Sequence, residues 1–136
     1  YQLVVNEKEE IIREEKTLLL NALNQSLEQI EANVHQLDGI LIPAHVDRKR
    51  FSLLSQLGLI PKGLKIDGLE FMNHPVTMDT ELLLNGYQSL PRFSSSDAHH
   101  PDQIGEHYTL IRMWEKSFHG LKEALENRNN FIPEAR

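Results

Sequence analysis

Residues 91–105 read Pro-Arg-Phe-Ser-Ser-Ser-Asp-Ala-His-His-Pro-Asp-Gln-Ile-Gly, and this stretch decides the expected fold. Its small and apolar residues stop at Asp97, which predicts a short buried strand over 92–96 with polar groups at its C-terminal tip. Residues two apart in an extended chain point the same way, so Asp97 and His99 are placed to bind one metal ion or one water. The catalytic candidates are therefore Asp97 and His99.

A second strand tip carries another histidine. Residues 39–45 form a continuous apolar run that ends in His45 and predicts a strand of a parallel sheet covered on both faces. The carboxyl ends of parallel strands meet at one edge, where α/β proteins bind their ligands. We therefore expect His45, Asp97 and His99 to be ligands of Zn²⁺, Mn²⁺ or Fe²⁺. Such an ion lowers the pKa of a bound water.

Further polar residues flank the two tips. Arg48 either grips phosphate or forms a surface ion pair with Asp47 or a nearby glutamate, and both interpretations stay open. Asp47 either orients an imidazole or is a solvated loop carboxylate. His100 is a candidate substrate contact, and Glu70 and His74 are weaker candidates for a site role.

The rest of the chain predicts helices alternating with strands. Ser26 and Gln29 form a capping-box pattern at the start of the clearest helix, and Gly39 suits a left-handed cap at its end. We expect strands over 1–5, 65–72 and 106–114, a surface helix or hairpin over 6–16, helices over 18–23, 27–37, 51–57, 76–84 and from 117, one helical turn over 101–105, and a fraying tail. This order predicts an α/β fold with a mostly parallel sheet and flanking helices.

Composition limits the function further. The chain has 136 residues, of which 40% are hydrophobic, enough for one domain over 1–136. A net charge of −6 makes nucleic acid an improbable partner. No apolar run approaches the ~20 residues of a membrane span. The absence of cysteine excludes thiolate zinc sites and suits a cytoplasmic location.

Three stretches resemble the PHP family, which is named for polymerase and histidinol phosphatase. They are residues 42–48, ending a strand in His45, residues 68–71, and residues 95–99, which carry Ser-Asp-x-His. Residues 51–58 also resemble one bacterial branch of stand-alone PHP proteins. The resemblance implies a distorted (β/α)7 barrel, up to three divalent metals and hydrolysis of phosphoester bonds. It likewise implies that His45, Asp97 and His99 are metal ligands.

The N-terminal motifs of that family are missing here. No histidine precedes His35 and no His-x-His occurs, so the sequence resembles the C-terminal part of such a barrel. We expect an incomplete metal cluster, no activity of this chain alone, and pairing with the missing N-terminal half or a second copy. The expected function is hydrolysis of a phosphomonoester or small phosphodiester, with a phosphorylated small molecule or nucleotide as substrate. A non-catalytic PHP-like interaction module is the alternative. An amidohydrolase-like zinc barrel is a third interpretation, which needs a lysine or histidine on a middle strand, where only Lys65 is available.

Overall fold

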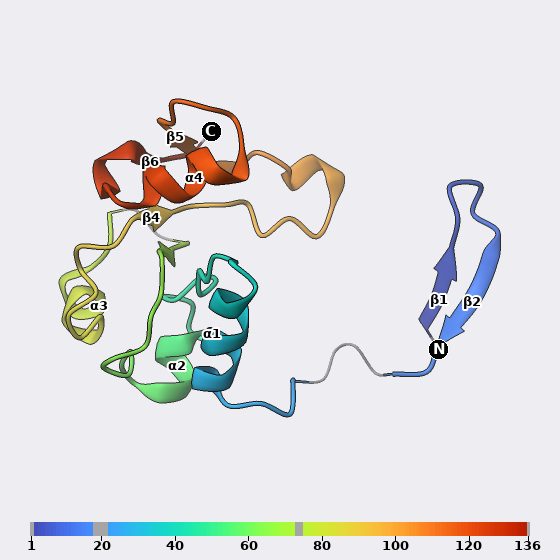
Figure 1. Ribbon diagram of the computed structural model, residues 1–136, viewed down its shortest axis with the longest axis horizontal. Helices are drawn as coiled ribbons and strands as arrows, with labels where there is room; N and C mark the ends of the chain where they lie inside the picture. Colours follow the sequence, from blue (N-terminus) through green and yellow to red (C-terminus); the bar gives the residue numbers. More distant parts are fainter. Residues whose placement is uncertain (1, 18–21, 73–74, 136) are drawn as a thin grey trace.

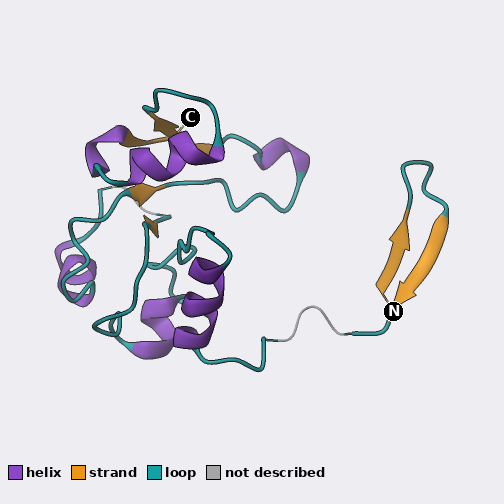
Figure 2. Cartoon of the chain, in the orientation of Figure 1, coloured by secondary structure: helices purple, strands orange, loops and turns teal. Residues whose placement is uncertain are grey.

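The computed structural model describes residues 2–17, 22–72 and 75–135, and Figures 1 and 2 show the arrangement of its elements. Along the chain these are β1 (Gln2–Val5), β2 (Ile11–Glu15), α1 (Leu27–Gln36), α2 (Leu53–Leu57), β3 (Leu69–Glu70), α3 (Met78–Leu83), β4 (Arg92–Phe93), the 3-10 turn η1 (Pro101–Gln103), β5 (His107–Ile111), α4 (Phe118–Leu125), η2 (Arg128–Asn130) and β6 (Phe131–Ala135). The expected helix over 18–23 falls largely on residues outside the described ranges.

The strands of the described chain pair two by two. β1 and β2 are antiparallel, β3 and β4 are parallel, and β5 and β6 are antiparallel. The prediction of a mostly parallel sheet forming the C-terminal part of a (β/α)7 barrel is therefore wrong. The expected strands over 65–72 and 92–96 are each reduced to two paired residues.

Residues 41–46 lie beside β3 without forming a regular strand. The Asp67 amide donates to the Leu41 carbonyl at 2.9 Å, and the Glu70 amide donates to the Pro43 carbonyl at 3.2 Å. The Val46 amide returns a bond to the Glu70 carbonyl at 2.8 Å. Pro43 has no amide hydrogen to donate in the middle of this ladder, which explains why the expected strand over 39–45 is only an extended segment.

The helix α1 begins as the sequence predicts. The Ser26 hydroxyl accepts from the Gln29 amide, and the Gln29 side chain accepts from the Ser26 amide. The helix end differs from the expectation, because Asp38 rather than Gly39 takes the left-handed conformation, with φ 59°. Glycine is still required at 39, since a Cβ there would meet Val34 Cγ1 and the Val34 carbonyl oxygen at 2.9 Å.

His35 joins α1 to the segment that leads into β3. Its Nε2 lies 3.0 Å from Asp67 Oδ2 and its Nδ1 lies 3.1 Å from Glu31 Oε1. The hydrogen bond that the imidazole donates to the Asp67 carboxylate raises the pKa of His35 above its ordinary value of 6.5, against partial desolvation, and Glu31 adds to the rise. His35 therefore forms a half-buried link between α1 and the segment before β3.

The link at His35 should make stability depend on pH. A raised folded pKa means that the stabilisation is complete below about pH 6.5 and is lost as pH rises through the folded pKa. In urea unfolding, His35→Asn should therefore cost more at about pH 5.5 than at about pH 8.5. Asp67→Asn removes the charge but keeps an oxygen for the Leu41 amide, and should reduce the same pH dependence. An equal cost of His35→Asn at both pH values would contradict the assignment.

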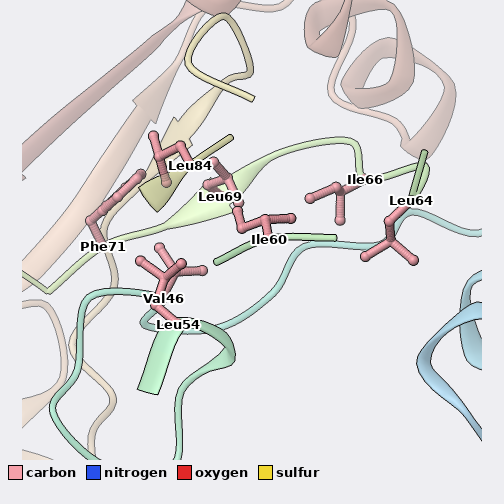
Figure 3. Packing of buried hydrophobic residues seen from close by; sticks show 8 residues of the cluster. All are labelled: Val46, Leu54, Ile60, Leu64, Ile66, Leu69, Phe71 and Leu84. Atoms are coloured by element: carbon pink, nitrogen blue, oxygen red, sulfur yellow. The ribbon is translucent and has the colours of Figure 1, made fainter. Parts of the chain in front are cut away.

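A single apolar cluster holds the middle of the chain together (Figure 3). Its buried members come from the loops and short elements between residues 46 and 84: Val46, Leu54, Ile60, Leu64, Ile66, Leu69, Phe71 and Leu84. Tyr87 lies at one side of the cluster, where its single hydroxyl hydrogen is shared between the carbonyls of Pro61 (2.9 Å) and Leu64 (2.8 Å). The helix α3 contributes little to the cluster, because its apolar residues Met78, Leu82 and Leu83 are exposed.

The last third of the chain forms a lobe of β5, β6, α4 and η2 (Figure 1). Its tail does not fray, because β6 pairs with β5 from Ile111↔Phe131 to His107↔Ala135. The lobe meets β4 through a side chain: Thr109 Oγ1 accepts from the Ser94 amide at 2.7 Å and donates to the Ser94 carbonyl at 2.9 Å. The Phe93 and Phe131 rings pack beside this seam, with centroids 4.8 Å apart.

The β1–β2 hairpin stands apart from the rest of the chain in Figure 1. The sequence allowed either a helix or a hairpin over residues 6–16, and the structure shows that this segment belongs to a hairpin.

None of the helices in the described ranges has the length and apolar character needed to span a bilayer.

Candidate functional site

Three parallel segments end side by side and form a rim of polar groups. Residues 41–46 bond to one edge of β3, and β3 pairs with β4 on its other edge, with Phe71 N donating to Phe93 O at 2.9 Å. Gly68 permits the close approach of β3 to β4, since a Cβ there would lie 2.5 Å from Phe93 Cε2. The carboxyl ends of these segments carry His45, Glu70 and Ser95, and we call this edge the rim.

Glu70 connects all three segments at the rim. Its Oε2 accepts from the His45 amide at 3.3 Å, and its Oε1 accepts from the Ser95 hydroxyl. From the sequence, Glu70 was only a weak candidate for a site role, and Ser95 was not a candidate. The run of three serines before Asp97 was the available signal, because small hydroxyl residues at a strand end commonly bond to neighbouring polar groups.

His45 occupies an unusual position for an imidazole. Its backbone has φ 33°, in the positive region that few residues other than glycine adopt. Its Nδ1 atom is buried and has no hydrogen-bond partner in the described structure. Unpartnered buried nitrogens are rare, and strained backbone gathers at functional sites. Both features set His45 apart from an ordinary loop residue.

Asp97 pairs with Arg48 across the rim. Arg48 Nη1 lies 3.0 Å from Asp97 Oδ2, with both side chains partly exposed. The surface pair considered for Arg48 from the sequence was with Asp47 or a glutamate, so the partner found here is a different one. Asp97, like His45, has a positive φ of 46°. Asp47 instead accepts the Met72 amide at Oδ1, 2.8 Å away, and so anchors the loop to the end of the β3 segment.

His99 and His100 lie on the turn that follows the rim. His99 Nδ1 is 2.7 Å from the Asp97 carbonyl oxygen; this carbonyl only accepts, so Nδ1 carries the hydrogen and Nε2 is left for other contacts. Gln103 Oε1 accepts the amides of both histidines, at 2.8 and 3.0 Å. Both side chains are exposed. The helical turn expected over 101–105 is confirmed, with Gly105 at φ 82°.

Ser96 fixes the loop that carries Asp97. Its hydroxyl accepts the amides of Gly105 (2.9 Å) and His107 (3.3 Å) and donates to the His107 carbonyl (3.0 Å). One side chain therefore closes the loop onto the start of β5. His74, the remaining site candidate, lies outside the described residues.

The rim fits part of a metal site. Imidazole nitrogen and carboxylate oxygen are suitable donors, and the unpartnered Nδ1 of His45 is what one ligand of an incomplete site would look like. Within the described ranges, however, no three histidine, aspartate or glutamate side chains converge closely enough to hold an ion. Arg48 is paired with Asp97, and Glu70 already accepts two bonds. Ligand roles for His45, Asp97 and His99 stay predictions.

Comparison with known proteins relates one part of this chain to a known family. Residues 88–130 match the protein family described as PHP-associated. The matched segment runs from the loop before β4, through the Asp97 loop, to η2. The match covers about a third of the chain and relates this segment to the PHP family, in agreement with the predicted relationship. No curated protein and no solved structure matches the chain.

Proposed function

We propose that this chain provides one wall of a PHP-type, metal-dependent phosphoesterase site. The observation that supports the proposal is the rim itself: three parallel segments bring His45, Glu70 and the Asp97 loop to one edge, with a buried imidazole nitrogen left without a partner. The relation of residues 88–130 to the PHP-associated family supports the same class.

Each residue has a distinct task under this proposal. His45, Asp97 and His99 would hold a divalent ion (Zn²⁺, Mn²⁺ or Fe²⁺), which supplies a hydroxide at neutral pH and charge for a phosphoryl group. Glu70 keeps the His45 backbone in its strained conformation, because it accepts the His45 amide. Arg48 has a planar guanidinium that can bind two phosphate oxygens, and Asp97 holds it at the rim. Because fewer than three ligands converge, further ligands must come from another segment or a second copy.

The test uses metal binding and turnover in the longer protein that the family resemblance implies. Asp97→Asn keeps the shape of the side chain and tolerates a positive φ, so the loop should keep its conformation. Because the substitution removes the carboxylate charge, it should lower Mn²⁺ affinity and turnover of 4-nitrophenyl phosphate by at least about a hundredfold. His99→Gln should act similarly. His119→Gln, an exposed histidine on α4, is the matched control and should change neither value. Normal turnover in Asp97→Asn would refute the ligand assignment.

A non-catalytic PHP-like interaction module is the second candidate. It is favoured by the finding that the rim carboxylates are already bonded within the described chain and that no three-ligand group forms. Calorimetry with Mn²⁺ separates the two candidates. Binding of several ions by the longer protein, with weak binding by this 136-residue chain, supports the phosphoesterase. No binding by either supports the module.

A further inference from the structure

An open cavity of about 480 Å³ lies beside the start of β4. Its lining combines Leu90 and Arg92, which lead into β4, with Arg128 and the first residues of β6. The cavity therefore lies where β4 and β6 meet, at the junction between the middle of the chain and the C-terminal lobe (Figure 1). The Asp97 loop follows the other end of β4, and no rim residue lines the cavity. Its volume is sufficient for a small organic molecule.

Two guanidinium groups line this cavity, and no aspartate or glutamate among the described residues does so. Arg92 Nη2 lies 2.6 Å from Glu81 Oε1, and Arg128 Nη1 donates to the Gln88 carbonyl at 3.0 Å. A guanidinium has five N–H donors, so each arginine keeps donors beyond this one polar contact. None of the ion pairs within the described ranges includes Arg128. In a chain with a net charge of −6, such a lining favours an anion.

The rest of the lining is mainly apolar. Its hydrocarbon surface comes from Leu90, Phe131, Ile132 and Pro133. Phe131 is buried and packs on the Phe93 ring, with centroids 4.8 Å apart, whereas the aliphatic side chain of Ile132 is 41% exposed. Inorganic phosphate would leave this surface uncovered. A carboxylate attached to a ring would cover it, and its two oxygens match the planar fork of a guanidinium.

We propose that this cavity binds a small organic acid, whose carboxylate is held by Arg92 and Arg128 and whose apolar part lies against Phe131. Glu81 already supplies a carboxylate to Arg92, so it competes with the ligand for part of that guanidinium. Arg128 lies exposed on η2 and provides the charge that no acidic side chain of the described chain neutralises. The bound acid contacts both the segment leading into β4 and the C-terminal lobe. The proposal is independent of the phosphoesterase function.

NMR titration of the 136-residue chain with three probes tests the proposal. Phenylacetate carries the carboxylate and the ring, acetate only the carboxylate, and 2-phenylethanol only the ring. Phenylacetate should shift the amide signals of residues 90–92 and 128–132, and it should bind at least about tenfold more tightly than either of the other probes. Equal affinity for acetate and phenylacetate, or shifts located elsewhere, would overturn the proposal.

Removal of one guanidinium tests the charge requirement. Arg128→Gln keeps a donor for the Gln88 carbonyl but loses the charge, and it should weaken phenylacetate binding by about fivefold or more. Arg112→Gln is the matched control, since Arg112 is exposed and does not line the cavity. It lowers the net charge equally and should leave the affinity unchanged. Wild-type affinity in Arg128→Gln would refute the assignment.

Removal of the competing carboxylate should have the opposite effect. Glu81→Gln releases Arg92 from its ion pair and should tighten phenylacetate binding by about twofold or more. Asp79→Asn changes the net charge by the same amount at an exposed position of the same helix, and it should leave binding unchanged. An equal gain in the two variants would show a general charge effect and count against the site. None of these measurements involves a phosphate or turnover, so their outcome leaves the proposed function untouched.

Discussion

Phe71→Ala should lower the free energy of unfolding by about 3–5 kcal/mol in urea denaturation. Phe71 is fully buried, at 0% exposure, and is the largest side chain of the apolar cluster, at one end of the group shown in Figure 3. Removing the ring leaves a cavity that the neighbours fill only partly. It also removes the face over which the Arg92 guanidinium lies, 5.5 Å from the ring centroid. A loss of this size is a large part of the 5–15 kcal/mol that stabilises a typical domain.

An exposed phenylalanine provides the matched control for this substitution. Phe118 begins α4 and is more than half exposed, so Phe118→Ala removes the same atoms from a position that is already in contact with solvent. We expect its effect to stay within about 1 kcal/mol, including the loss of the ring next to Lys122. If the two variants lost equal stability, the cluster would not have the central role that its burial indicates.

Gly120→Ala should destabilise the chain, although alanine is the better helix former. Within a helix this exchange ordinarily gains about 0.5–1 kcal/mol. Here the added Cβ would lie 2.2 Å from the backbone oxygen of Glu115 and 3.1 Å from its carbonyl carbon. Backbone atoms cannot rotate away as a flexible side chain does, so the start of α4 must move. We expect a net loss of about 2 kcal/mol or more.

His119→Ala is the control for Gly120→Ala, because His119 is the preceding residue of the same helix and is mostly exposed. Its stability should change by no more than about 0.5 kcal/mol in the same thermal melts. A rise in melting temperature for Gly120→Ala would show that helix propensity outweighs the contact with Glu115, and would contradict the close approach described here.

Local signals in the sequence predicted the helices well. The capping box at Ser26 and Gln29 forms as expected, and Ser117 caps α4 through the Gly120 amide at 3.0 Å. Such bonds join residues three apart, so their geometry is contained in the sequence. The parallel relation of β3 and β4 was also predicted, while its extension into a barrel was wrong. Pro43 interrupts one neighbouring ladder, and the Thr109 side chain takes the Ser94 backbone groups on the other.

The candidate site was predictable only in outline. The sequence indicated that His45 and Asp97 follow neighbouring extended segments, and the structure places both segments beside β3. It did not indicate that Arg48 would pair with Asp97, because the partners are 49 residues apart and depend on tertiary packing. Nor did it indicate that Glu70 would bond to both flanking segments. Side-chain partners of this kind follow from the fold rather than from spacing along the chain.

The seam between Ser94 and Thr109 has a consequence for how the protein is put together. The Thr109 hydroxyl bonds to the backbone amide and carbonyl of Ser94, which a neighbouring strand would otherwise bond to. The segment of β4 and Ser94 therefore bonds to β3 on one side and to the C-terminal lobe on the other. The PHP-associated match at residues 88–130 spans both sides of this junction. That segment contributes the loop bearing Asp97, and the lobe contacts the chain on either side of this loop through the hydroxyls of Thr109 and Ser96 and through the paired rings of Phe93 and Phe131. A shift of the lobe would therefore displace that carboxylate.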